Sequence, residues 1–153
     1  MDLVTRDLAS AEFADLRRMI EVAEAAQSRA YAPYSHYQVG CALLLGDGRV
    51  VGGCNVENAS YGGTICAERG AVMAAVAGAS GTLGRKVEAC LTISPAVPVG
   101  SCCGLCRQVL FEFGGPAVLV FNASSGGDMV RRSTLGELLP FGFGPAALDS
   151  AAG

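Results

Sequence analysis

The chain has 153 residues, of which 51% are hydrophobic and only 16% charged, a balance that suits one compact domain over residues 1–153. Its net charge is −3 at pH 7 and Lys86 is the only lysine, so the sequence lacks the basic face with which nucleic-acid-binding proteins neutralise phosphates. The composition therefore argues against nucleic-acid and membrane partners, favours a small-molecule substrate, and leaves so little polar surface that we expect a homo-oligomer.

The expected elements follow from apolar periodicity and from turn residues. Leu16 and Ile20 lie at helical spacing after Ser10, which can cap a helix, and Gly46-Asp47-Gly48 is typical of a hairpin turn. In chain order we predict a helix over residues 10–30, strands over 37–45 and 49–55, a helix over 66–77, a strand over 87–94, a helix over 104–113, strands over 117–121 and 129–131, the last as a short edge strand, and a helical turn over 134–139.

Helices that separate strands indicate parallel crossovers, and the hairpin adds an antiparallel pair. We therefore expect an α/β fold, with a mixed sheet of about five strands between helices on both faces. Residues 1–9 and 149–153 are expected to form flexible ends.

Seven cysteines accompany an acidic, polar N-terminal segment with no apolar core of a secretory signal. We therefore expect a cytoplasmic protein, in which cysteines are more often metal ligands or buried thiols than disulfide partners. No apolar run reaches the ~18 residues that a membrane span requires.

Two short motifs carry the chemistry: Cys66-Ala-Glu68, and Cys103-Gly-Leu-Cys106. Each stands at the start of a predicted helix, where unpaired N–H groups and the helix dipole favour thiolate over thiol. Three thiolates supply three corners of a zinc site whose fourth position is left for water. Glu68 is the expected acid/base residue, as in zinc deaminases generally.

Longer segments around these motifs resemble the small homotetrameric cytidine deaminases that act on free nucleosides. The resemblance runs from residue 31 to about residue 148 and includes Ala-Pro-Tyr-Ser-His-Tyr-Gln-Val-Gly at 32–40 and Gly-Cys-Asn-Val-Glu-Asn-Ala-Ser-Tyr at 53–61. It implies a three-layer α/β/α domain, one Zn²⁺ per subunit, and hydrolysis of cytidine or deoxycytidine to the uracil nucleoside and ammonia by a zinc-bound hydroxide, in pyrimidine salvage.

The resemblance also implies roles for individual residues. Asn55 and Glu57 would bind a ribose hydroxyl, Tyr37 would stack on the pyrimidine, and the backbone at Cys66 and Ala67 would recognise the cytosine edge. Tyr61 would reach into a neighbouring subunit's site, Phe143 would help to close the pocket, and Arg69 would hydrogen-bond the ligand thiolates.

One departure from the family is Cys102, which stands where a proline is usual and offers a competing thiol. This departure leaves open the alternative that the protein is a deaminase of a cytosine-nucleoside antibiotic of the blasticidin S kind. Non-catalytic alternatives are a zinc-stapled interaction domain, a closed site that also uses Cys41 or Cys54, and plain buried thiols. Asn55 and Glu57 can also merely shape a loop, and Tyr37 and Tyr61 can be core aromatics.

Overall fold

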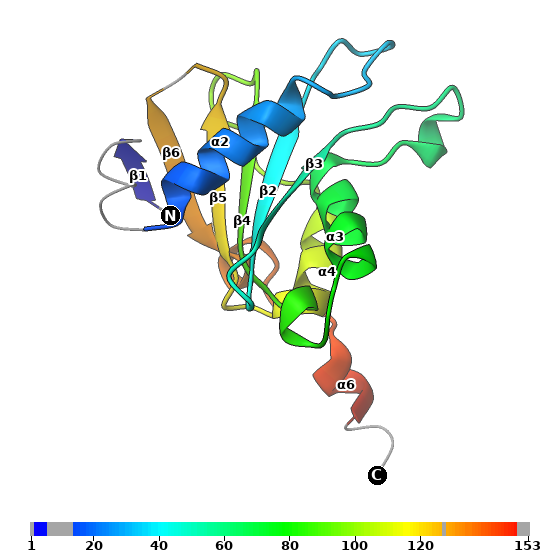
Figure 1. Ribbon diagram of the computed structural model, residues 1–153, viewed down its shortest axis with the longest axis vertical. Helices are drawn as coiled ribbons and strands as arrows, with labels where there is room; N and C mark the ends of the chain where they lie inside the picture. Colours follow the sequence, from blue (N-terminus) through cyan, green and yellow to red (C-terminus); the bar gives the residue numbers. More distant parts are fainter. Residues whose placement is uncertain (1, 6–13, 127, 150–153) are drawn as a thin grey trace.

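The computed structural model describes residues 2–5, 14–126 and 128–149, and its centre is a six-stranded sheet in the order β1-β6-β5-β4-β2-β3 (Figure 1). The strands are β1 (Asp2–Thr5), β2 (Gly40–Leu45), β3 (Val50–Cys54), β4 (Val87–Ser94), β5 (Leu119–Ser124) and β6 (Met129–Thr134). The helices are α2 (Leu16–Gln27), α3 (Ala67–Ala77), α4 (Gly104–Gly114), α5 (Leu135–Leu138) and α6 (Pro145–Asp149), with single 3₁₀ turns η1 (Tyr61–Gly63) and η2 (Leu83–Arg85).

The sheet is mixed, as the sequence predicts. β2 and β3 form the antiparallel hairpin, and α4 connects β4 to β5, which pair in parallel. β3 and β4 are connected through α3 and lie on either side of β2, which is antiparallel to both. The two crossover helices, α3 and α4, both pack against this sheet.

The sixth strand corrects the expectation from sequence. Residues 2–5 were assigned to a flexible end, but they form β1 and pair antiparallel with β6, with Asp2 opposite Arg132 and Thr5 opposite Met129. β6 is consequently an inner strand and not the predicted edge strand.

Helices cover both faces of the sheet, which confirms the three-layer α/β/α arrangement. In Figure 1, α2 crosses one face and α3 lies beside α4 on the other. Each interface encloses its own buried cluster, one of which contains Met19 of α2 and Leu91 of β4 and the other Ala71 of α3 and Leu43 of β2. α2 begins at Leu16, and the predicted cap Ser10 and core residue Phe13 lie outside the described residues.

Small residues bring α3 into close contact with the hairpin. Ala67, Ala71 and Ala75 recur every four residues and are buried on one face of α3. They face Gly53 of β3, where an added Cβ would lie 2.3 Å from the backbone nitrogen of Ala71. The position of α3 is therefore fixed by direct contact with the sheet.

Within the described part of the chain, no helix is both long and apolar enough to cross a bilayer.

Candidate metal centre and active site

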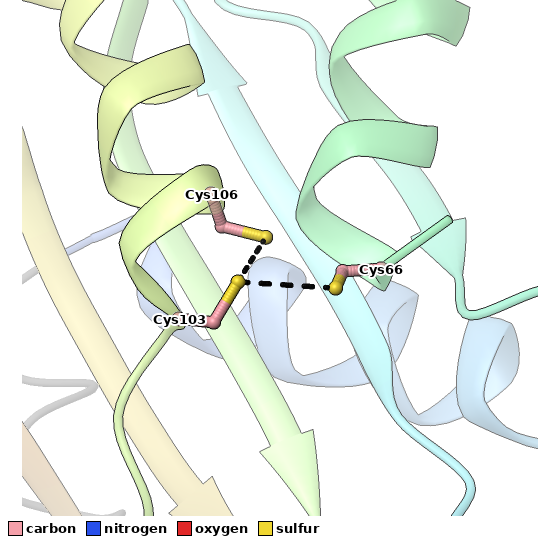
Figure 2. A group of neighbouring side chains, drawn as sticks. All are labelled: Cys66, Cys103 and Cys106. Carbon is pink, nitrogen blue, oxygen red and sulfur yellow. Dashed lines mark hydrogen bonds between the residues drawn. The ribbon is translucent and has the colours of Figure 1, made fainter. Parts of the chain in front are cut away.

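Three thiols meet where α3 and α4 begin. Cys66 and Cys103 are the N-cap residues of α3 and α4, both with extended backbone, and Cys106 lies in the first turn of α4. Figure 2 shows their side chains pointing toward one another, with Cys103 Sγ 3.9 Å from Cys66 Sγ and 3.4 Å from Cys106 Sγ. The structure thus brings together the three cysteines predicted as ligands.

The spacing of these sulfurs fits a zinc ion. Thiolates bound tetrahedrally at a Zn–S distance of about 2.3 Å lie about 3.8 Å from one another. The three sulfurs lie within 4.8 Å of each other, and among the described residues no other group of His, Cys, Asp or Glu gathers in this way. The cluster therefore needs little rearrangement to bind zinc through three sulfurs.

The electrostatic surroundings favour a thiolate. The Cys106 thiol, together with the Arg69 guanidinium, lowers the pKa of Cys66 to about 5. Arg69 Nη2 lies 3.7 Å from Cys66 Sγ and donates to the carbonyl of Thr64 at 2.8 Å, which holds the guanidinium in place. Arg69 thus lies beside Cys66, one of the three cysteines predicted as ligands.

Glu68 is buried beside the cluster. It is the second residue of α3, its side chain is 5% exposed, and its Oε2 accepts a hydrogen bond from Cys106 Sγ at 3.4 Å. Burial raises the pKa of its carboxyl group. A carboxyl group with a raised pKa is suited to exchanging protons near neutral pH.

A cavity of about 420 Å³ opens onto the cluster. A volume of this size suits a small organic molecule. The predicted site residues that line this cavity are Tyr37, Asn55, Glu57, Cys66, Ala67, Glu68 and Cys103.

Asn55 and Glu57 make backbone contacts in the free protein. Asn55 Oδ1 accepts from the backbone N–H of Val39 at 2.8 Å, and the Glu57 carboxylate accepts from the backbone N–H groups of Tyr34 and Ser35. Hydrogen bonds from Ser35 and Tyr34 lower the pKa of Glu57. Both residues therefore shape the loop, and both also face the cavity.

The three predicted aromatic positions separate into two groups. Tyr37 lines the cavity, is 40% exposed, and its hydroxyl lies 3.1 Å from Ser94 Oγ, so it is not a core aromatic. Tyr61 and Phe143 are 76% and 58% exposed and do not line the cavity. In a single chain these two side chains therefore lie outside the cavity.

The remaining thiols do not join the cluster. Cys102 lines the cavity, and its burial raises the pKa of its thiol to about 11. Cys41 and Cys90 are fully buried core residues whose sulfurs are 3.7 Å apart, whereas Cys54 is only partly buried. A closed site that includes Cys41 or Cys54 finds no support in this geometry.

Polar residues of two sheet strands also line the cavity and were not singled out from the sequence. Thr92 and Ser94 come from β4, and Asn122 comes from β5. The predicted strand ended at residue 121, so Asn122 fell outside it. An available signal was the polar side chain at 122 in a strand whose neighbours are apolar.

This arrangement defines a class. Zinc deaminases place one ligand two residues before a glutamate at one helix start, and a Cys-x-x-Cys pair at another. The family model for the cytidine and deoxycytidylate deaminase zinc-binding region matches residues 14–122. The chain belongs to this family.

Individual relatives agree. The chain is 45% identical over 119 residues to a cytidine deaminase of Mycobacterium tuberculosis, which covers 78% of this chain and 82% of that protein. It is 37% identical over 138 residues to a cytidine deaminase of Sporosarcina psychrophila, and the match covers 90% of this chain and 98% of that protein. The crystal structure of cytidine deaminase from Burkholderia pseudomallei superposes with a TM-score of 0.75 at 44% identity, covering 83% of this chain and 98% of that one.

Proposed function

We propose that the protein hydrolyses the 4-amino group of cytidine or deoxycytidine, giving the uracil nucleoside and ammonia. The observation that carries the proposal is the position of Glu68, which is buried, touches the three-thiol cluster and lines the cavity. The relatives named cytidine deaminase at 37% and 45% identity support the choice of substrate.

The thiols of Cys66, Cys103 and Cys106 would hold zinc, which when bound supplies a water whose pKa is lowered toward neutrality. Glu68 takes one proton of the attacking water and delivers it to N3 of the cytosine. It then takes the second proton from the new hydroxyl at C4 and passes it to the leaving amine, so that C4 becomes a carbonyl and ammonia departs. Arg69 offsets the negative charge of the thiolates beside Cys66.

Side chains of the cavity would orient the nucleoside. Tyr37 presents its ring as a surface for the pyrimidine, Asn55 and Glu57 present polar atoms to a ribose hydroxyl, and the backbone at Ala67 binds the cytosine edge. All four residues line the cavity, which supports these assignments.

The direct test is the fall in ultraviolet absorbance as purified protein converts cytidine, with deoxycytidine and blasticidin S run in parallel. We expect cytidine and deoxycytidine to be turned over faster than the antibiotic. Faster turnover of blasticidin S would identify an antibiotic deaminase. If zinc-loaded protein turned over none of these cytosine nucleosides, the deaminase proposal would be wrong and the non-catalytic interaction domain would be favoured.

We further infer a cytoplasmic homotetramer whose subunits complete one another's sites. Support comes from the high exposure of Tyr61 and Phe143, and from Met73, Val76 and Leu105, which are 56%, 40% and 66% exposed on α3 and α4. Light scattering is expected to give the mass of four chains.

Shared sites are tested by mixing two inactive variants, Glu68→Gln and Tyr61→Ala, after dissociation and reassembly. Mixed tetramers contain some sites with native Glu68 beside native Tyr61, so activity should return. If the mixture stays as inactive as its components, Tyr61 does not act in a neighbour's site.

A further inference from the structure

A buried polar pair lies in the wall of the cavity, away from the metal ligands. Asn122 of β5 is directly opposite Thr92 of β4 in the parallel register, and its Nδ2 donates to Thr92 Oγ1. The two residues are 2% and 7% exposed, and both line the cavity. They occupy central strands of the sheet.

The carboxamide of Asn122 has hydrogen-bonding capacity left over. None of the described residues donates a hydrogen bond to its Oδ1, although the atom is buried. Turning the amide by 180° would let the Thr92 hydroxyl donate to Oδ1 and would leave Nδ2 over instead. In both orientations, one polar atom of the amide has no partner among the described residues, and the residue itself lines the cavity.

Packing alone gives no reason for this side chain. On the same face of the sheet, the preceding positions in the two strands are Cys90 and Val120, which belong to the apolar core. Asparagine is disfavoured in strands, and an unpaired buried amide atom costs stability. Asn122 thus replaces a core-forming residue at the point where the core meets the cavity.

The pair is well separated from the loop residues Asn55 and Glu57. Asn55 follows the end of β3, and the strand order places β2 and β4 between β3 and β5. At a strand spacing of about 4.8 Å, Asn122 lies about 14 Å across the cavity floor from that end. One ligand group cannot contact both places.

We propose that Asn122, positioned by Thr92, binds a hydroxyl group of the nucleoside at a second subsite of the cavity. A hydroxyl both donates and accepts, so it pairs with the free amide atom in either orientation. The proposal rests on the proposed nucleoside deaminase activity, and it makes Asn122 a specificity-determining residue.

The test pairs a change in the protein with a change in the ligand. The wild type and Asn122→Leu, which has nearly the same shape without polar atoms, are compared on cytidine and its 2′-deoxy, 3′-deoxy and 5′-deoxy forms, and on 5-hydroxymethylcytidine. These ligands distinguish a sugar hydroxyl from a hydroxyl carried by the base. For one hydroxyl, the wild type should show roughly a tenfold to hundredfold preference in kcat/KM, and Asn122→Leu should lose it.

Ser133→Ala is the matched control. Ser133 is also buried and its Oγ also has no hydrogen bond from the described residues, but it does not line the cavity. Its loss should leave every preference unchanged. If Asn122→Leu lowers kcat/KM equally for all ligands, or if Ser133→Ala removes the same preference, Asn122 has a structural role only and the proposal is wrong.

A second variant and a binding measurement complete the test. Asn122→Val, with a side chain suited to strands, replaces Asn122→Leu if that variant does not fold. Calorimetric binding of the same nucleosides to zinc-loaded protein provides the preference independently of turnover. An inactive wild type that still shows an Asn122-dependent preference in binding would refute the deaminase activity and retain the subsite.

Discussion

The side chain of Asn55 holds the backbone of Tyr37 in place. Asn55 Nδ2 donates to the carbonyl oxygen of Tyr37 at 2.9 Å, while Oδ1 accepts from the N–H of Val39 two residues further on. The same side chain that faces the cavity therefore also fixes the segment that carries the proposed base-stacking ring.

Asn55→Ala should consequently lower both stability and substrate affinity. The variant leaves the N–H of Val39 without its partner, and such a loss costs roughly 1–3 kcal/mol. Urea unfolding should show that cost, and KM for cytidine should rise because Tyr37 is no longer held. Asn55→Asp keeps only the acceptor, so its stability and its KM should lie between those of the wild type and of Asn55→Ala. A rise in KM without any loss of stability would mean that Asn55 acts on the ligand alone.

Glu68→Gln should abolish turnover but not metal binding. The amide cannot take or return a proton, and the loss of a general acid/base residue lowers kcat roughly a hundredfold to ten-thousandfold. Zinc content, measured on the same samples, should stay at the wild-type level. Glu112→Gln, an exposed position on α4, is the matched control and should keep full activity. Turnover by Glu68→Gln within a few-fold of the wild type would exclude Glu68 as the proton carrier.

Cys103→Ser should reduce zinc content well below the wild-type value, because a hydroxyl group is a poor substitute for a thiolate ligand. Cys102→Ser and Cys54→Ser change thiols outside the three-sulfur cluster and should bind zinc normally. Removing the metal with a chelator should stop turnover and lower stability by on the order of a few kcal/mol. Loss of zinc from Cys102→Ser would assign that thiol to the metal.

Glu57 should make stability fall in acid. Hydrogen bonds from Ser35 and Tyr34 lower the pKa of its carboxyl group from the ordinary value of 4.5. The stabilisation is therefore fully present above about pH 4.5 and is lost as pH falls through the lower folded-state value. Melting temperatures of the wild type and Glu57→Gln should differ near neutral pH and converge in acid. A difference that does not change with pH would show that the charge of Glu57 is not involved.

Each half of the metal centre was predictable because its motif is local. Cys103 and Cys106 are three residues apart, and a helix start places such neighbours on one side of its first turn. The meeting of this pair with Cys66, at the start of α3, depends on the fold. The α/β class and the mixed sheet followed equally from the alternation of helices and strands.

The features that could not be predicted from the sequence depend on contacts between distant segments of the chain. β1 is only four residues long, and its partner β6 lies more than a hundred residues further along the chain. The pairing of Thr92 with Asn122 exists only through the register of β4 and β5, since neither residue has a local partner. Tyr61 and Phe143 were placed by resemblance alone, and the single chain leaves both exposed.

The contact of Gly53 with α3 separates the position of the helix that carries Glu68 from the composition of the loops around the cavity. Evolution can then alter the two independently. Because the helix that follows Cys66 and carries Glu68 rests on β3 itself, its position is set by direct contact with the sheet, whereas loops supply other walls of the cavity. Insertions and substitutions in those loops can diversify the range of accepted nucleosides while the chemistry stays intact. A single methyl group added at position 53 would do the reverse, disabling the reaction from a site that no ligand touches.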